Sequence, residues 1–188
     1  MLVVAQTEQL PVAEARAGST EAWDALFRRY QLPLYVYAVE LVQNEQAALD
    51  AVQEGFIAAA RHLPGLREDG KFGSWLFGIV HQKCLQHWRR QGREAAVVEQ
   101  LSAEPLEYEE DPGELLLRRE QESEFLLLLD QLPPAQRSAV LLHFLEGFSL
   151  ADIAAITGVS LGTVKSRLHY ARKTLRQLWP EESSQIDP

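Results

Sequence analysis

The sequence predicts an all-α protein with two small helical domains joined by a flexible acidic linker. Apolar residues recur every three or four positions through most of the 188 residues, and strand-like alternation is nearly absent. This periodicity fades between residues 94 and 112, which hold Glu, Pro and Ser. A glycine also separates two short amphipathic segments near the C-terminus. We therefore predict an N-terminal domain over 13–93, a linker over 94–112 and a C-terminal helix-turn-helix domain over 113–179.

The N-terminal domain is expected to begin with a short helix over 12–17. Ser19 or Thr20 caps a second helix, because short polar side chains accept hydrogen bonds from the first free backbone amides of a helix. Pro33 lies inside this second helical pattern and is expected to kink or loosen it. The residues expected on its inner side are Trp23, Leu26, Phe27, Tyr30 and Leu34.

Two further helices complete the predicted N-terminal domain. Asn44 caps a helix that runs to about residue 63, where a Pro-Gly pair breaks the pattern. An Asp-Gly turn follows, and a fourth helix covers about 74–91. The residues expected to face the core are Ala48, Val52, Phe56 and Ala59 in the third helix and Trp75, Leu76, Ile79 and Val80 in the fourth.

The C-terminal domain is expected to resume the helical pattern at residue 114. Pro134 suits the first turn of a helix over 135–145, because an amide there needs no intrahelical partner. Ser149 caps the next helix, and Gly158 falls where a tight turn needs positive φ. Ser160 caps the last helix. Its predicted buried stripe is Val164, Leu168, Ala171 and Leu175.

The last helix is expected to present cations and small hydroxyls on its outer face. Such a helix suits entry into a DNA major groove, while an ordinary helical hairpin with a solvated basic face is the alternative. The outward or flanking residues are Thr163, Lys165, Ser166, Arg167, His169, Tyr170, Arg172, Lys173 and Arg176.

Charge is distributed unevenly along the chain. The formal net charge of −9 taken alone argues against DNA binding, because DNA affinity comes largely from neutralised phosphates. Residues 61–93, however, carry seven basic and two acidic side chains, and residues 131–179 carry six and two. Between them, residues 94–130 carry two basic and twelve acidic side chains. This pattern predicts two DNA contacts separated by a repulsive connector, against the alternative of a solvated linker without a role.

Several segments in order carry a family resemblance. They are Asp50–Leu63, Lys71–Val80 with the following Arg89 and Arg90, Leu132–Ser149, and the helical hairpin described above. Together they resemble an extracytoplasmic-function (ECF) sigma factor, the small two-domain class of bacterial transcription initiation factors. The resemblance spans roughly residues 13–178. It implies a cytoplasmic protein that brings RNA polymerase core to promoter DNA and that, in many relatives, is held by an anti-sigma factor.

The resemblance assigns one polar face to RNA polymerase. Asp50, Gln53 and Glu54 share one face of the third helix, and they match the family motif that binds the clamp coiled coil of the polymerase. Leu49 stands where the family often has an acid. Ordinary solvation of a helix is the alternative reading of this face.

The resemblance assigns the −10 promoter element to the N-terminal domain. In the family, the loop over 64–73 captures a base flipped out of the −10 element, and flipping has to be offset by stacking and hydrogen bonds. Gln82 and Gln86 replace the Asn and Asp usual in the family, so the −10 preference does not carry over. The C-terminal part of the fourth helix is basic, with Lys83, Arg89, Arg90 and Arg93. Compensation of the helix dipole is the alternative explanation for these cations. The residues assigned to the −10 region are Arg67, Lys71, Gln82, Gln86, Arg89 and Arg90.

The resemblance assigns the −35 element to the last helix. We expect Lys165 and Ser166 to read bases there, and Arg172 and Lys173 to hold the DNA backbone. His169 and Tyr170 are unusual for the family and predict an atypical −35 preference.

The sequence shows no catalytic motif, so we expect a binding protein rather than an enzyme. His81, Cys84 and His87 are spaced three residues apart, and successive steps around a helix make the three side chains diverge, so we expect no metal or other cofactor. A stand-alone helix-turn-helix regulator with a helical sensor or dimerisation domain is the alternative function. No apolar run is long enough for a signal or a membrane span.

Overall fold

The computed structural model describes residues 10–90 and 127–178, and every regular element within these ranges is a helix. The N-terminal unit holds α1 (Val12–Arg16), α2 (Thr20–Val42), α3 (Glu45–His62), short 3-10 turns η1 (Leu63–Gly65) and η2 (Asp69–Lys71), and α4 (Phe72–Arg90). The C-terminal unit holds α7 (Pro134–Val140), η4 (Leu141–Leu145), α8 (Leu150–Thr157) and α9 (Leu161–Leu178). The all-α fold with two helical domains is thus confirmed, and the predicted linker over 94–112 lies outside the described residues.

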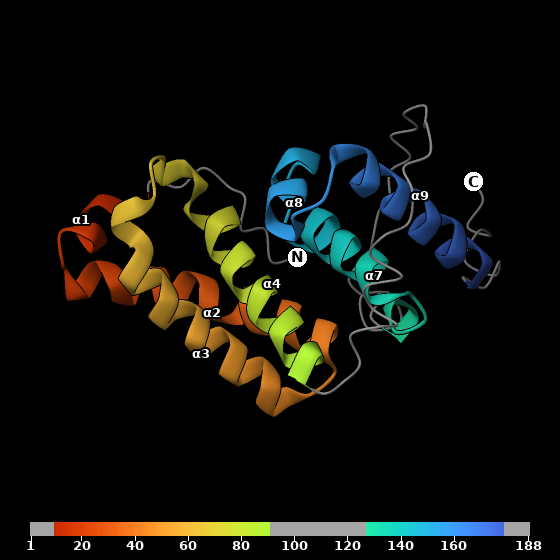
Figure 1. Ribbon diagram of the computed structural model, residues 1–188, viewed down its shortest axis with the longest axis horizontal. Coiled ribbons are helices and arrows are strands. Elements are labelled where there is room, and N and C mark those ends of the chain that lie inside the picture. The colour runs from red at the N-terminus through yellow and green to blue at the C-terminus, as the bar shows by residue number, and fades with distance from the viewer. Residues whose placement is uncertain (1–9, 91–126, 179–188) are drawn as a thin grey trace, which may run out of the picture.

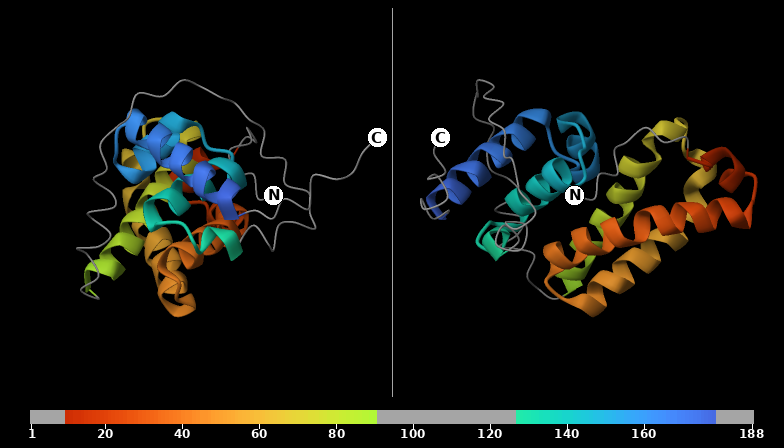
Figure 2. Two further views of the ribbon diagram at one scale, coloured as in Figure 1. Left: turned by 90° about the vertical axis from the view of Figure 1, so that its right-hand side faces the viewer. Right: turned by 180° about the vertical axis from the view of Figure 1, so that it is seen from behind.

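Side-chain caps start the long N-terminal helices at the predicted positions. The Ser19 hydroxyl accepts a 3.2 Å hydrogen bond from the Ala22 amide, and the Asn44 side chain accepts one of 2.8 Å from Ala47. The turn between α2 and α3 is short, so the two helices run back along each other (Figures 1 and 2). Helix α4 packs against both of them and completes the domain.

One detail of this domain differs from the sequence-based expectation, while the expected kink or loosening at Pro33 stays a prediction. Helix α2 continues as one element through Pro33, which is buried. Phe27, expected inside, is 42% exposed and rests on Phe56 with ring centroids 4.8 Å apart. The position of Phe27 at the edge of the apolar stripe explains the difference, because one neighbouring helix covers only part of its ring.

Close approach of α3 and α4 depends on a glycine. A Cβ built on Gly55 would lie 2.5 Å from Cγ2 of Val80, which is fully buried. Any larger residue at position 55 therefore pushes the two helices apart. This tight contact fixes the position of α4, which carries many of the predicted functional residues.

The C-terminal unit contains the predicted helical hairpin. Ser149 accepts from the Asp152 amide at 3.2 Å, Ser160 accepts from Thr163 at 3.1 Å, and Gly158 has φ +71°. All four residues predicted for the buried stripe of α9 are buried. The segment expected as one helix over 135–145 is divided in two: α7 ends at Val140, and η4 follows with a wider turn. In that turn the Glu146 amide bonds the Leu141 carbonyl at 3.2 Å. Such a wider turn is a known variation on the α-helix.

The two units contact each other chiefly through α4 and α8, with a second contact between α2 and α7 (Figure 1). Phe77 and Phe148 meet edge to face with centroids 5.1 Å apart. A Cβ on Gly78 would lie 3.8 Å from the Ile156 Cα atom. The Arg137 guanidinium donates a 2.8 Å hydrogen bond to the Glu40 carbonyl. The contact therefore combines apolar packing with directed polar bonds.

Candidate functional site

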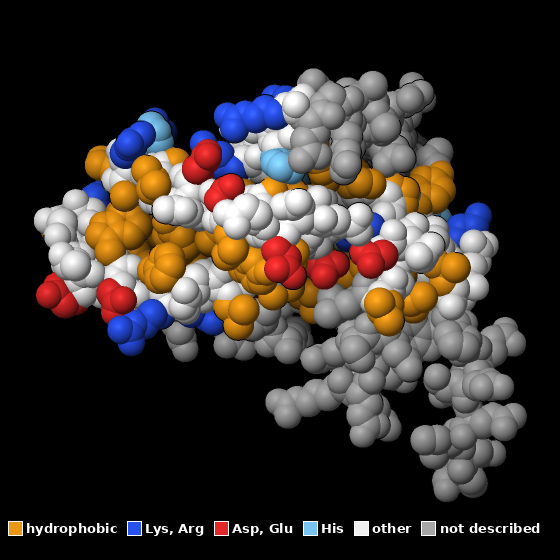
Figure 3. Space-filling view, turned by 90° about the horizontal axis from the view of Figure 1, so that it is seen from below, with side chains coloured by type: hydrophobic (Ala, Val, Ile, Leu, Met, Phe, Trp, Pro, Cys, Tyr) orange, Lys and Arg blue, Asp and Glu red, His pale blue; other side chains and the backbone are white. Residues whose placement is uncertain are grey.

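The polar face predicted on α3 is accessible. Asp50, Gln53 and Glu54 are all exposed, and the apolar side chains of Leu49 and Ile57 beside them are 51% and 46% exposed. Seen from below the view of Figure 1, acidic and hydrophobic side chains lie side by side on the surface (Figure 3). A face that mixes carboxylates with uncovered aliphatic groups is suited to bind another macromolecule, because both kinds of group gain partners on contact.

An ion pair ties this face to α4. The Lys83 ammonium donates to the Glu54 carboxylate at 2.9 Å, and this hydrogen bond lowers the pKa of Glu54. The pair borders a hollow of about 350 Å³ that Asp50, Gln86 and Arg90 also line. The structure thus brings together residues that the sequence assigned to two different partners. A change at Glu54 consequently also releases Lys83.

The loop over 63–71 joins α3 to α4 and carries two of the predicted DNA-binding cations. Arg67 and Lys71 are both exposed, and the Lys71 ammonium pairs with the Asp152 carboxylate of α8 at 2.8 Å, which raises the pKa of Lys71. Phe72 at the end of the loop is buried in the core, while Trp75 is half-buried. Of the two rings, only that of Trp75 is therefore open to a ligand.

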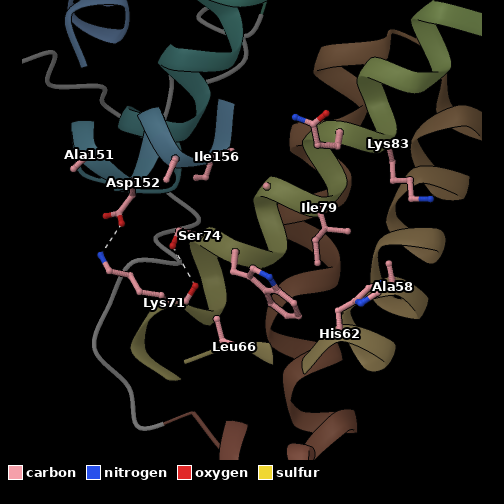
Figure 4. A pocket seen from close by; sticks show the side chains of 14 residues that line it. Ala58, His62, Leu66, Lys71, Ser74, Ile79, Lys83, Ala151, Asp152 and Ile156 are labelled. Atoms are coloured by element: carbon pink, nitrogen blue, oxygen red, sulfur yellow. Dashed lines mark hydrogen bonds and ion pairs between the residues drawn. The ribbon is translucent and has the colours of Figure 1, made fainter. Parts of the chain in front are cut away.

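A groove of about 660 Å³ runs between the domains beside this loop. Leu66, Trp75 and Ile79 form much of its apolar wall, and Gln82 also lines it. Ile156 belongs to the wall on the side of α8, where the Lys71–Asp152 pair lies (Figure 4). Lys71 and Gln82, predicted for the −10 region, thus share one concave surface.

The other residues predicted for the −10 region lie along the exposed side of α4. Gln86, Arg89 and Arg90 are exposed near its C-terminal end, where Trp88 anchors the helix in the core. Gln86 and Arg90 line the hollow beside α3, whereas Gln82 lines the interdomain groove. The predicted residues therefore form one strip along α4 rather than one compact pocket.

The predicted DNA-reading helix is α9, and most of its predicted residues are accessible. Tyr170 and Lys173 are exposed, while Thr163, Lys165, His169 and Arg172 are half-buried. Ser166 and Arg167 differ from the prediction, because both are only 5% exposed. Ser166 donates a 3.1 Å hydrogen bond to the Gly162 carbonyl within its own helix.

Arg167 lies within electrostatic reach of the N-terminal domain. Its charge acts on Tyr37 of α2 and on His81 of α4, and burial lowers the pKa of Arg167. The apolar periodicity of α9 predicted an outward-facing Arg167, because that periodicity reflects only packing within the helical hairpin. Helix α7 also packs against α9, and Tyr37 and His81 of the N-terminal domain lie within electrostatic reach of the Arg167 charge.

A buried polar cluster lies at the same domain contact. The Tyr37 hydroxyl shares hydrogen bonds with Nδ1 of His81 at 2.7 Å and with the Ser138 hydroxyl of α7 at 2.8 Å. Burial, together with the charge of Arg167, lowers the pKa of His81 to about 4. His81 is therefore neutral at physiological pH, and it links the two domains through Tyr37.

The predicted absence of metal binding concerns His81, Cys84 and His87. In the described ranges no group of three His, Cys, Asp or Glu side chains is placed to hold a metal ion. Burial raises the pKa of the Cys84 thiol to about 12, so the thiol is protonated at physiological pH. Cys84 packs in the core of the N-terminal domain. Across the described residues, none of the helices has both the length and the apolar character to cross a membrane.

Sequence reasoning did not single out Arg16. Its guanidinium donates to the Leu63 carbonyl at 3.5 Å and to the Leu66 carbonyl at 3.2 Å, and it also bonds the Asp69 carboxylate. These contacts connect α1 to the loop over 63–71. A basic residue in the last turn of a short helix was the only sequence signal, and helix-dipole compensation accounts for that equally well.

Comparison with known proteins identifies both domains. The family model for Sigma-70 region 2 matches residues 26–94, and that for Sigma-70, region 4 matches residues 122–175. The RNA polymerase sigma-H factor of Pseudomonas aeruginosa is 33% identical over 184 residues, which cover 93% of this chain and 94% of the relative. The ECF RNA polymerase sigma factor SigE of Mycolicibacterium smegmatis is 35% identical over 170 residues, 87% of this chain and 64% of that relative.

Solved structures agree with this assignment. The sigma factor RpoE in its co-crystal structure with the anti-sigma factor NepR from Bartonella quintana is similar to this chain with a TM-score of 0.60 and 28% sequence identity. The match covers 81% of this chain and 95% of the RpoE chain.

Proposed function

Because the chain belongs to the ECF sigma factors, which direct RNA polymerase to promoters, we propose specific roles for its exposed surfaces. The α3 face binds the polymerase clamp, the loop over 63–71 and the strip along α4 bind the −10 element, and α9 binds the −35 element. The proposed residues are Asp50, Gln53 and Glu54 for the clamp; Arg67, Lys71, Gln82, Gln86, Arg89 and Arg90 for the −10 element; and Thr163, Lys165, Ser166, Arg167, His169, Tyr170, Arg172 and Lys173 for the −35 element.

One observation carries the polymerase assignment. Asp50, Gln53 and Glu54 are exposed together on α3 at the positions of the family motif, with Leu49 and Ile57 uncovered beside them. A helix-turn-helix regulator with a separate sensor domain has no reason to carry this face. The face therefore favours the sigma factor over the alternative of a stand-alone regulator.

The division of labour follows domain boundaries. We assign clamp and −10 binding to residues 13–93 and −35 binding to residues 113–179, with 94–112 as the acidic connector. The chain contributes binding and promoter choice, and the polymerase contributes the chemistry of RNA synthesis, which places the protein in the cytoplasm with the chromosome. By analogy with RpoE and NepR, an anti-sigma factor is a further proposed partner.

Within α9 we propose that base reading and backbone binding are divided. Lys165 lies in the first turns of the helix, where side chains reach base edges, whereas Arg172 and Lys173 lie further along and bind phosphates. Ser166 bonds its own helix in this arrangement, so its hydroxyl reads a base only after exchanging the Gly162 carbonyl for that base.

The proposal is tested by run-off transcription from a defined promoter with sigma-free core polymerase. Asp50→Lys reverses a charge on the α3 face without releasing Lys83, and Lys is a good helix former. We expect this variant to bind core at least about tenfold more weakly, which corresponds to about 1.4 kcal/mol. Pull-down of core measures the affinity, and circular dichroism checks the helix content.

Asp24→Lys is the matched control, because Asp24 is exposed on α2 and lies outside the proposed face. It should leave core binding unchanged. Equal core binding by wild type and the Asp50→Lys variant would remove the clamp assignment. A wild-type chain that binds DNA tightly but yields no promoter-specific transcript would favour the stand-alone regulator.

A further inference from the structure

Arg16 connects three points of the loop over 63–71. Its Nε donates to the Leu63 carbonyl and its Nη2 to the Leu66 carbonyl, at 3.5 and 3.2 Å, and Nη2 also bonds Oδ1 of Asp69. The three partners span both short turns of the loop, η1 at one end and η2 at the other. A planar guanidinium with donors in a fixed fork serves such a set better than a single ammonium.

Helix α1 is itself anchored, so it is able to hold the loop. Val12 and Ala15 are buried against the rest of the domain, and the Trp23 indole of α2 donates a 3.0 Å hydrogen bond to the Ala15 carbonyl. Arg16 therefore extends from a fixed support. The Arg16 side chain itself is 30% exposed.

Besides the bonds to Arg16, buried Leu63 holds the start of the loop and the Lys71–Asp152 bond holds its end, but the middle has little packing. A Cβ built on either Gly65 or Gly70 would have no atom within 4 Å, and Arg67 and Glu68 are exposed. Leu66 packs partly against the core, and the Leu66 amide bonds the Leu63 carbonyl at 3.0 Å. With so little packing, the conformation of the loop depends strongly on the bonds to Arg16.

We propose that Arg16 is a positioning residue for promoter recognition: it holds the loop over 63–71 in the shape that accepts a base of the −10 element. The inference rests on the proposed role of this loop in −10 binding. Extruding a base costs a few kcal/mol, and ordering a loose loop on binding would add to that cost. A loop without one fixed shape would also accept different bases more equally. Arg16 removes that ordering cost before DNA arrives.

The test compares Arg16→Met with Arg16→Lys and with a control on the same domain. Arg28→Met is the control, because Arg28 makes an exposed ion pair with Asp24 within α2. Each variant is assayed in complete holoenzyme by run-off transcription on two promoter sets. One set carries single substitutions in the −10 element and the other carries them in the −35 element.

We expect Arg16→Met to reduce the preference between −10 bases about tenfold while leaving the −35 preference and core affinity unchanged. Arg16→Lys should restore part of the −10 preference, since an ammonium replaces some of the three bonds. Arg28→Met should match wild type. If Arg16→Met lowers −10 preference, −35 preference and core affinity in parallel, its role is only structural. If it changes none of them, the loop does not need Arg16.

Hydrogen exchange of the loop amides in the free protein separates this inference from the function on which it rests. Arg16→Met should exchange faster at residues 63–71 than wild type, with unchanged exchange in α3. Wild-type exchange rates in the variant would overturn the positioning role, whatever the transcription assay gives. A wild-type protein that shows no −10 preference, with a loop that loosens in the variant, would instead overturn the −10 assignment.

Discussion

The loop over 63–71 and helix α9, the two proposed promoter-reading regions, are presented in different ways. The loop is held from within its own domain by Arg16 and leaves Arg67 exposed. In helix α9, by contrast, Arg167 is buried, and its charge acts on Tyr37 and His81 of the other domain. We therefore propose that the −10 surface is accessible in this arrangement, whereas Arg167, which is only 5% exposed, contacts DNA after the domains separate.

The contact between the domains is of a kind that allows separation. Among the described residues it contains the Phe77–Phe148 pair, the packing of Gly78 on Ile156, the Arg137–Glu40 bond and the buried polar cluster around Tyr37. The exposed Lys71–Asp152 pair adds little, since surface ion pairs contribute about 0–1 kcal/mol. Interdomain contacts within one chain often resemble transient protein interfaces, so motion between domains is the ordinary expectation.

Among the substitutions that test this comparison, Gly78→Ile is expected to have the largest effect on the availability of α9. The Cβ position of residue 78 lies 3.8 Å from the Ile156 Cα atom and 3.9 Å from the Ile156 carbonyl oxygen. Because Ile branches at Cβ and is stiff in helices, Gly78→Ile places a methyl or ethyl group against α8 and separates the domains. For each 1.4 kcal/mol by which the substitution weakens the free energy of domain association, the affinity of the free protein for a −35 duplex should rise about tenfold.

Gly78→Ala is the matched control for this effect. A single methyl fits at an ordinary contact distance, and Ala is favoured over Gly in a helix by about 1 kcal/mol. The Ala variant should therefore raise thermal stability without changing −35 affinity. Fluorescence anisotropy with labelled duplex and thermal unfolding measure the two quantities. Equal −35 affinity in both variants would show that the domain contact does not limit α9.

A smaller effect is expected from pH through His81. Tyr37, which also bonds Ser138, shares a hydrogen bond with it, the charge of Arg167 acts on it, and its pKa is lowered to about 4 from 6.5. Below pH 6.5 His81 binds a proton in the unfolded chain, whereas in the native fold it stays neutral down to about pH 4. The His81 contribution to stability is thus fully present above pH 6.5 and is lost as the pH falls toward 4.

His81→Gln isolates this contribution, because Gln does not titrate. As the pH falls from 6.5 to 4, the unfolding free energy of wild type should decrease relative to that of the variant. Glu146 acts in the opposite direction: burial, opposed by Arg29, raises its pKa to about 8, so its contribution grows as the pH falls from 8 to 4.5. It is present in both proteins and cancels. A pH-independent difference would contradict the neutral, buried His81.

The local features that the sequence predicted are those decided within a few residues. Ser19, Asn44, Ser149 and Ser160 cap helices as expected, and Gly158 adopts positive φ. Each depends on hydrogen bonds or backbone geometry that adjacent residues determine. The order of helices and the buried stripe of α9 follow from the same local periodicity.

Features that depend on distant partners were not predictable in this way. Arg167 looks exterior on a helical wheel and is buried in the folded chain, while Phe27 looks interior and is partly exposed. Arg16 bonds a loop about 50 residues away, and nothing in the intervening sequence signals that pairing. Amphipathic patterns record which side of a helix is apolar, but they do not identify which surface covers it.

The central claim is that α9, unlike the loop over 63–71, becomes available to DNA only when the two domains separate. A reversible crosslink between α4 and α8 tests this most directly. Gly78→Cys and Ile156→Cys, combined with Cys84→Ala, bring two thiols within disulfide reach, because the Cβ position of residue 78 lies 3.8 Å from the Ile156 Cα atom. After oxidation we expect efficient intramolecular crosslinking and loss of −35 duplex binding, with recovery after reduction. An oxidised, crosslinked protein that binds the −35 duplex as tightly as the reduced one would contradict the account, as would the absence of any crosslink.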